Sequence, residues 1–295
     1  MSHLIVNADD FGLTAGVNRA VMELHTAGVL TSTTLMARAA ATSEAVSMAR
    51  ATPSLGVGCH VVLVDGDPVL PAKEIPSLLD PRTGRFHATL GAFLPRLLTG
   101  RIRSAEIQAE AVAQIAQLQS AGVTLSHIDT HKHVHMFPAV LKPVLRAAAG
   151  CGICLIRNPF EPAWSLRATS GAPWLRRAQV QLLRQLLPAF RKHVARAGLA
   201  STDGAVGVLA TGTLDAAAVR SLLTSLPSGT WELVAHPGYN DAALAHAHTR
   251  LLASRETERD ALHALKDFPA IELISFADLK SDASGTTGFG RTGKL

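Results

Sequence analysis

Short apolar runs alternate along the chain with longer segments in which apolar residues recur at helical spacing. The short runs predict strands at residues 4–6, 31–37, 55–63, 125–128, 153–156, 231–235 and 272–275. The longer segments predict helices at residues 16–26, 42–51, 105–120, 139–149, 214–226 and 255–265, with Ser43 as a cap of the second. Strands that alternate with helices in this way are typical of βαβ units around a parallel sheet. About seven such units predict an α/β fold of the TIM-barrel type, an irregular (β/α) barrel.

The same pattern predicts one domain over residues 1–295 with two excursions from the barrel. The first, near residues 65–84, carries proline and glycine and is expected to be a long loop on the barrel rim. The second, near residues 157–200, begins with a segment rich in proline and tryptophan.

Composition excludes several classes of protein. The N-terminal MSHLIVNADD has three consecutive apolar residues before two carboxylates, which argues against a signal peptide, and no apolar run is long enough to span a membrane. Three cysteines are an odd number, which fits a reducing cytoplasm better than a disulfide scaffold. The net charge is +5, but the lysines and arginines are only weakly clustered, and aromatic residues make up 4% of the chain. No nucleic-acid partner is therefore expected.

Polar residues stand where the predicted strands end. Asp9 and Asp10 follow the first strand directly, and His60 lies near the end of the third. A structural interpretation is open for each: the aspartates could form a turn and cap a helix, and the histidine could be a hydrogen-bonded core residue.

The segment HIDTHKHVH, at residues 127–135, favours a metal site over these structural interpretations. Four histidines and Asp129 alternate in it, so an extended conformation would project them from one face. Imidazole and carboxylate together are the usual ligands of zinc and similar divalent metals, although Mg²⁺, Mn²⁺ and Co²⁺ remain alternatives. The competing interpretation is a solvated histidine-rich loop.

A last polar group follows the strand at residues 231–235. His236 precedes Pro237 and Gly238, and a rigid turn of this kind suits a general acid or a supporting side chain. A divalent metal, one aspartate bound to it and a second aspartate free to take a proton favour hydrolysis of an amide or ester. A glycoside hydrolase and a metal-binding protein without catalysis remain alternatives.

The motifs NADDFG, TST, GCHVVL, HIDTHKHVHMFP and HPGY, in this order, resemble those of the YdjC-like carbohydrate deacetylases over residues 4–279. The resemblance implies an irregular (β/α) barrel related to the NodB-type polysaccharide deacetylases, and metal-dependent removal of acetyl groups from N-acetylated sugars. It implies that Asp10, His60 and His131 bind the metal, that Asp9 activates water and that His236 acts as a general acid or stabilises the transition state. Two further residues, His133 and His135, would line or support the site.

A narrower resemblance, in HVVLVDGDPVLPAKEIPSLLD and IRNPFEP, is to the hopanoid-biosynthesis-associated deacetylases. It implies a substrate with an N-acetylglucosaminyl headgroup on a hopanoid lipid, with a chitooligosaccharide as the alternative. Arg157 and Glu161, both in IRNPFEP, would then contact substrate or support the ligands. The family resemblance also makes a homodimer an expected form of the protein.

The segment at residues 174–196 places apolar residues at near-helical spacing between arginines and lysines. Such a basic amphipathic helix could touch an anionic membrane surface from the cytoplasm. The alternative is that its apolar face packs on the barrel while its arginines are solvated. Pro188 would divide it into two shorter helices.

Overall fold

Seven strands form one curled sheet in a computed structural model that describes residues 2–247, 249–281 and 287–288. Six follow the order β4-β3-β2-β1-β6-β5, all parallel, and β7 pairs with the start of β1. Their bounds are β1 Ser2–Phe11, β2 Ser32–Leu35, β3 Gly56–Val61, β4 His127–Thr130, β5 Gly204–Val206, β6 Gly229–Ala235 and β7 Glu272–Leu273. A short antiparallel pair, β8 Lys280–Ser281 and β9 Thr287–Gly288, lies outside this sheet.

The sheet curls into an irregular (β/α) barrel, as the strand and helix pattern predicts. Between β4 and β5 the ring is joined by single bridges, from Ile128 to Ile156 and from Leu155 to Ala200. The strand predicted at residues 153–156 is therefore reduced to bridges. The three-residue β5 was not predicted, because so short a strand has no recognisable alternation.

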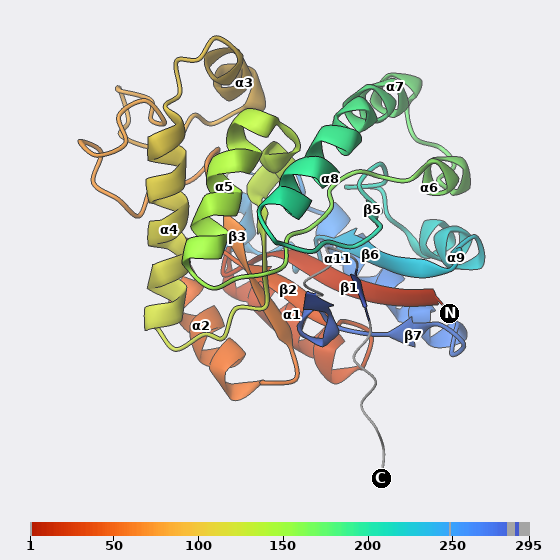
Figure 1. Cartoon of the computed structure of the whole chain (residues 1–295). Coiled ribbons are helices and arrows are strands. Elements are labelled where there is room, and N and C mark those ends of the chain that lie inside the picture. The colour runs from red at the N-terminus through yellow and green to blue at the C-terminus, as the bar shows by residue number, and fades with distance from the viewer. Residues whose placement is uncertain (1, 248, 282–286, 289–295) are drawn as a thin grey trace.

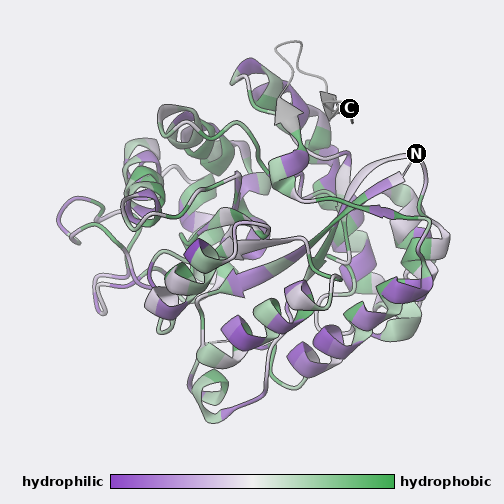
Figure 2. Ribbon diagram, turned by 90° about the horizontal axis from the view of Figure 1, so that it is seen from below, coloured by the Kyte–Doolittle hydropathy of each residue, from purple (hydrophilic) through white to green (hydrophobic). Residues whose placement is uncertain are grey.

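The six predicted helices are present and surround the sheet (Figure 1). They are α1 Ala15–Thr26, α2 Thr42–Ala51, α4 Ser104–Ser120, α5 Pro138–Gly150, α9 Ala216–Thr224 and α11 Ser254–Ala261. In Figure 2 they carry both hydrophilic and hydrophobic stretches, as helices packed on one face do. Ser43 is not the cap of α2: Ala41 occupies that position without a side-chain hydrogen bond.

The remaining helical elements were not predicted, with three exceptions. These elements are α3 Leu90–Leu98, α6 Ala163–Ala168, α7 Trp174–Leu183, α8 Leu187–Arg196, α10 Ala242–His246 and the 3-10 helices η1 His131–Met136, η2 Arg184–Leu186, η3 Leu262–Asp267 and η4 Phe276–Asp278. Of these, α7 and α8 correspond to the basic segment at residues 174–196, which was expected to form two helices divided by Pro188, and η3 continues α11 within the helix predicted at residues 255–265. No helix in the described part of the chain is both long and apolar enough to cross a membrane.

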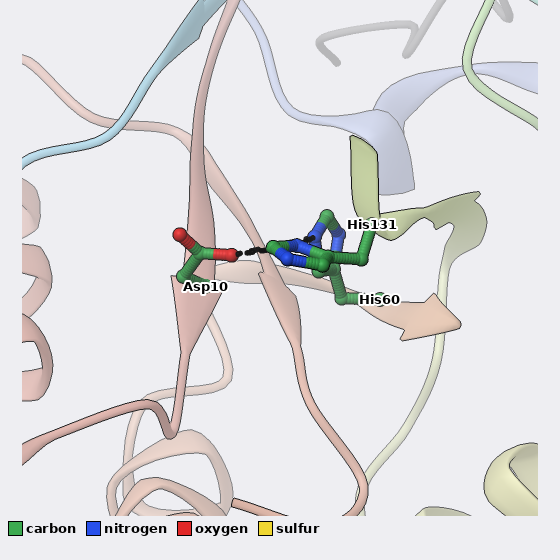
Figure 3. Close-up of side chains that lie close together, drawn as sticks. All are labelled: Asp10, His60 and His131. Atoms are coloured by element: carbon green, nitrogen blue, oxygen red, sulfur yellow. Dashed lines mark hydrogen bonds and ion pairs between the residues drawn. The ribbon is translucent and has the colours of Figure 1, made fainter. Parts of the chain in front are cut away.

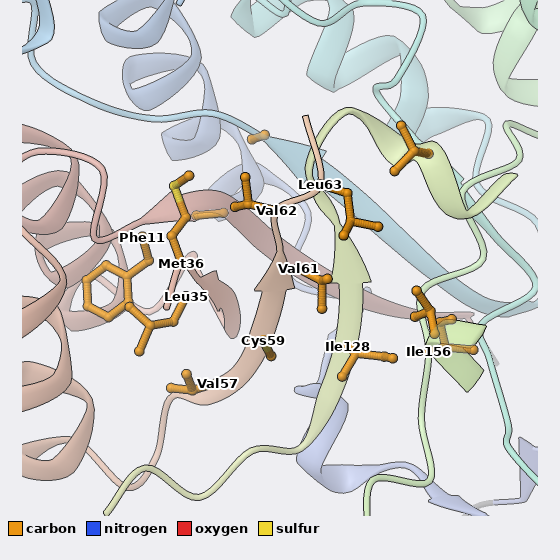
Figure 4. Packing of buried hydrophobic residues seen from close by; sticks show 14 of the residues in the cluster. Phe11, Leu35, Met36, Val57, Cys59, Val61, Val62, Leu63, Ile128 and Ile156 are labelled. Atoms are coloured by element: carbon orange, nitrogen blue, oxygen red, sulfur yellow. The ribbon is translucent and has the colours of Figure 1, made fainter. Parts of the chain in front are cut away.

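The period of two along the strands separates an apolar outer layer from a polar barrel interior. In β3, Val57, Cys59 and Val61 join the large core cluster beneath the helices (Figure 4). The alternate residue His60 instead faces the interior, where it contacts Asp129, its partner on the neighbouring strand β4. Because a strand directs successive side chains to opposite faces, every strand of the ring can contribute polar groups to the interior without breaking the core.

The opposite end of the interior is closed by apolar side chains. Ile5 belongs there to a second buried cluster with Leu155, Ala200, Ile274, Phe276 and Leu279. The ring of His127 stacks on Phe276 at 3.8 Å between centroids, beside Gly58. A Cβ at Gly58 would lie 2.6 Å from the His127 ring, so this close approach requires glycine.

The excursion near residues 65–84 is a loop, as predicted, and one face of α4 holds it in place. Glu110 accepts hydrogen bonds from the backbone N–H groups of Val69 and Leu70 at 2.8 and 3.0 Å. One turn later in α4, Gln114 accepts a hydrogen bond from the backbone N–H of Val62 and donates one to its carbonyl. One turn earlier, Glu106 accepts from the backbone N–H of Ser77. This ladder fixes a segment that borders the cavity described below.

The basic segment at residues 174–196 fits the alternative of packing on the barrel only in part, and its contact with a membrane surface stays a prediction. It is indeed divided, with Pro188 in the first turn of α8. In α7, however, Trp174 and Leu182 are exposed at 78% and 72%. Arg176 and Arg177 of the same helix turn inward and donate to backbone carbonyls of neighbouring loops. Within this segment the fully buried apolar side chains are Phe190 and Val194 of α8, and Leu183, Leu186 and Leu187 pack partly buried against the core.

The Glu110 ladder yields a stability prediction. Glu110→Ala would leave two backbone N–H groups of the loop without their acceptor, at a cost of about 2 kcal/mol. Chemical denaturation should show this loss of unfolding free energy, while Gln108→Ala, which removes a surface contact to Arg146, should cost less than about 0.5 kcal/mol. Equal stability of both variants would mean that the ladder does not hold the loop.

Candidate metal centre and active site

A left-handed backbone at Asp10 brings two adjacent carboxylates to one cavity. Successive strand residues normally point to opposite faces, but Asp10 has φ 66° and the β1–β2 register shifts between Ala8 and Phe11. Asp9 and Asp10 therefore both line the cavity at the carboxyl end of β1. The left-handed conformation costs a non-glycine residue about 1 kcal/mol, and residues held in it are concentrated at functional sites.

Asp10, His60 and His131 converge from the ends of β1, β3 and β4 (Figure 3). Asp10 Oδ1 lies 3.5 Å from His60 Nε2 and 3.2 Å from His131 Nδ1, and the two nitrogens are 3.1 Å apart. Ligand atoms about 2.1 Å from a common metal lie roughly 3 to 3.4 Å from each other. The three atoms thus have the spacing of a ligand set.

Two further features fit a cation. Asp10 Oδ1 is buried and makes no hydrogen bond of good geometry, which leaves it free for a metal. Burial lowers the pKa of His60, but the charge of Asp129 and contacts with Asp10 outweigh it and raise that pKa to about 10. The carboxylates therefore need a positive charge between them, which either a proton on His60 or a bound metal supplies.

His60 is oriented for this role by its second nitrogen. Its Nδ1 lies 2.7 Å from Asp129 Oδ1 and 3.1 Å from the hydroxyl of Thr34, so Nε2 faces Asp10. A carboxylate on the far nitrogen of a histidine ligand fixes the ring and raises its basicity.

Next to the ligand set lie three more carboxylates, Asp9, Asp129 and Glu232, and the side chain of Arg157 neutralises them. The fully buried guanidinium of Arg157 donates two hydrogen bonds to Asp9, at 2.9 and 2.7 Å, and one to Glu232 at 2.7 Å, and also pairs with Asp129. Burial raises the pKa of Asp9, but Arg157 and His60 outweigh it and hold that pKa well below its ordinary value. Burial raises the pKa of Glu232 to about 7. Arg157 thus supports the site from within the barrel.

The histidine segment is not extended, contrary to the expectation from its alternation. β4 ends at Thr130, and Lys132 and His133 have φ 57° and 53° inside η1. The chain therefore turns after His131.

This turn sends the remaining histidines in different directions. His127 lies at the closed end of the barrel, away from the metal ligands. His133 lines the cavity, and burial lowers its pKa to about 3. His135 is buried and bonds the Thr130 hydroxyl at 2.7 Å and the backbone carbonyl of Arg157 at 3.2 Å, so it supports the turn.

His236 follows β6 and lines the same cavity as Asp9, Asp10 and His131. Its Nε2 is 3.7 Å from Asp9 Oδ2, and its backbone N–H donates to Glu258 at 2.6 Å. Burial lowers the pKa of His236, but the contact and charge of Glu258 and the charges of Asp9 and Asp10 raise it overall. His236 can therefore carry a proton next to Asp9.

Helix α11 supplies two functional contacts that the sequence patterns did not reveal. Arg255 donates to Asp10 Oδ2 at 2.5 Å, and Glu258, three residues later, holds the backbone of His236 and of Gly212. Two charged residues spaced to lie on the buried face of a helix were the available signal.

In the described part of the chain, Glu161 has no hydrogen bond or ion pair with Asp10, His60 or His131. Its buried carboxylate accepts from Ser165 at 2.5 Å and from the backbone of Gly207 and Leu209, so it braces loops beside the barrel. That Glu161 contacts substrate or supports the ligands stays a prediction.

The ligands open onto a cavity of about 1090 Å³. Asp9, Asp10, His131 and His236 lie on its wall together with apolar side chains from three other segments, Leu90, Leu175 and Leu251. Its volume suits a ligand larger than a single small molecule such as acetate.

Comparison with known proteins agrees with this architecture. The family model described as YdjC-like protein matches residues 3–266. The chain is 43% identical to a carbohydrate deacetylase of Brevibacillus brevis over 145 residues, which are 49% of this chain and 55%, about half, of that protein. It is 32% identical over 306 residues to the Homo sapiens carbohydrate deacetylase, covering 96% of this chain and 92% of the human one.

A solved structure has the same fold over almost its whole length. It is that of an Enterococcus faecalis V583 protein described as a candidate cellobiose-phosphate cleavage protein, with a TM-score of 0.74 and 25% identity over 93% of this chain and 97% of that one. Family model, relatives and fold agree, and this chain belongs to the YdjC-like family.

Proposed function

We propose that this chain is a metal-dependent hydrolase that removes the acetyl group from an N-acetylated sugar. The observation that carries the proposal is the convergence of Asp10 Oδ1, His60 Nε2 and His131 Nδ1 within 3.5 Å of one another, beside Asp9 and His236. The relatives described as carbohydrate deacetylases support the reaction class.

Asp10, His60 and His131 would hold the metal, which when bound polarises a carbonyl and lowers the pKa of water. Asp9 is kept ionised by Arg157 and can accept the proton of the attacking water, although its low pKa makes it a weak base. His236, 3.7 Å from Asp9, can carry a proton to the departing amine or donate a hydrogen bond to the developing oxyanion.

The finer part of the proposal is that the sugar is linked to a lipid, as in a glycosylated hopanoid. Leu175 on α7 and Leu90 on α3 line the cavity, and Leu175 is 55% exposed. Trp174, beside it, is more exposed still. An apolar group attached to the sugar could bury these side chains, at about 25 cal/mol for each Å² removed from water. A chitooligosaccharide is the alternative substrate.

The reaction and the metal can be tested together. Metal-loaded protein should release acetate from diacetylchitobiose, and more rapidly from N-acetylglucosaminyl hopanoid if the lipid-linked proposal holds. His131→Ala should lose the metal and the activity together because one of three ligands is gone. Asp9→Asn should keep the metal and lose about 10²- to 10⁴-fold in rate, as for a missing general base.

Acetate release and metal content are the measurements, with thermal unfolding to check that Asp9→Asn still folds around Arg157. Release of a shorter sugar in place of acetate would indicate a glycoside hydrolase. Stoichiometric metal without any product would indicate a metal-binding protein, and full metal content in His131→Ala would reject the ligand assignment.

His236 yields a separate kinetic prediction. If it protonates the leaving amine, His236→Ala should keep the metal but lower kcat on the acetamide by about 10²-fold. The loss on an activated acetate ester should be much smaller, because that leaving group needs little protonation. Equal losses on amide and ester would favour oxyanion stabilisation, and unchanged kinetics on both would leave His236 with a structural role only.

A further inference from the structure

Strained backbone is concentrated at the cavity. Among the described residues, the non-glycine residues with positive φ are Asp10, Asp65, Lys132 and His133, and all four line this one cavity. Strain of this kind persists where the side chain is needed in a particular direction. Asp10 is accounted for as a ligand and His133 follows from the turn after His131, but the proposed reaction uses neither Asp65 nor Lys132.

Asp65 and Lys132 form an ion pair on the cavity wall. Lys132 Nζ donates to Asp65 Oδ2 at 2.6 Å, and the two side chains are 27% and 12% exposed. An ammonium has three donors and a carboxylate has two acceptor oxygens. Within the described part of the chain this is the one hydrogen bond formed by either side chain, so Asp65 Oδ1 and the remaining Lys132 donors can serve a ligand.

The pair is not required to hold the loop that carries Asp65. The backbone of that loop is fixed by the bond from Asp65 N–H to the carbonyl of His87 at 3.0 Å and by the α4 ladder through Glu110. A second ion pair on the same excursion, Asp67 with Arg85, is 46% and 51% exposed and lies off the cavity wall.

Lys132 follows the metal ligand His131 in the chain, and Asp65, His131 and Lys132 line the same cavity. We propose that Asp65 and Lys132 form a subsite for the hydroxyl groups of the pyranose ring that bears the acetamide. Asp65 accepts hydrogen bonds from neighbouring hydroxyls and Lys132 donates to a hydroxyl oxygen, both charge-assisted. This subsite rests on the proposed function, because it assumes a sugar in the cavity.

Sugar affinity measured without turnover tests the subsite. Isothermal titration of diacetylchitobiose into the metal-free full chain should show a Kd about ten- to hundredfold weaker for Asp65→Asn and for Lys132→Met than for the unchanged protein. The matched control Asp67→Asn, on the same loop, should bind within about twofold of it.

A charge swap separates a binding role from a simple latch. The double variant Asp65→Lys with Lys132→Asp keeps an ion pair between the two segments but exchanges acceptor and donor. A latch would retain sugar affinity in the swapped protein, whereas the subsite predicts a loss at least as large as in the single variants. Thermal unfolding of each variant shows whether it is folded when titrated.

The outcomes separate the subsite from the reaction. Wild-type affinity in the single variants or in the swapped protein would overturn the subsite, as would the absence of sugar binding to the unchanged protein. If the variants lose sugar binding while the metal-loaded protein releases no acetate, the subsite stands and the proposed deacetylation fails. If acetate is released and the variants bind sugar normally, the reaction stands without the subsite.

Discussion

The buried guanidinium of Arg157 is the interaction on which the rest of the barrel interior depends. The period of two along the strands places Asp9, Asp129 and Glu232 on the same inner wall, and three carboxylates cannot be buried together without a cation. Arg157 is held in return by these partners, and its backbone carbonyl accepts from His135. Removing one partner of such a network would leave an uncompensated buried charge, typically at a cost of 3–5 kcal/mol.

Because Arg157 neutralises Asp9, Asp129 and Glu232, the neighbouring set of Asp10, His60 and His131 is left for a metal. His60 joins the two: its Nδ1 contacts Asp129, which Arg157 neutralises, and its Nε2 faces Asp10. Asp10 has a guanidinium of its own, Arg255, on the opposite oxygen from the ligand nitrogens. The candidate metal centre therefore needs five separate parts of the chain to be in place, which carry Asp10, His60, Asp129 with His131, Arg157 and Arg255. Metal binding would stabilise the closed barrel by mass action.

The sequence predicted the barrel, the six helices that alternate with its strands and the position of the polar residues at strand ends, because periodicity is a local property of the chain. It could not predict where β4 ends, since two consecutive left-handed residues, Lys132 and His133, have no local signature. Alternation alone therefore misplaced His127 and His135. Arg255 and Glu258 were missed for a different reason: their partners lie more than 20 residues away and are brought close only by closure of the barrel. The roles of Asp9 and His236 stay predictions until activity is measured.

In this account Arg157 neutralises the carboxylates of Asp9, Asp129 and Glu232, while a metal binds to Asp10, His60 and His131. Anomalous diffraction from a crystal grown with Mn²⁺ tests it most directly, because the metal is located without any assumption about substrate. We expect one strong peak between Asp10 Oδ1, His60 Nε2 and His131 Nδ1, with Arg157 still paired to Asp9. A peak among Asp9, His60 and Asp129 with Arg157 displaced, or no peak at a metal concentration that supports activity, would contradict the account.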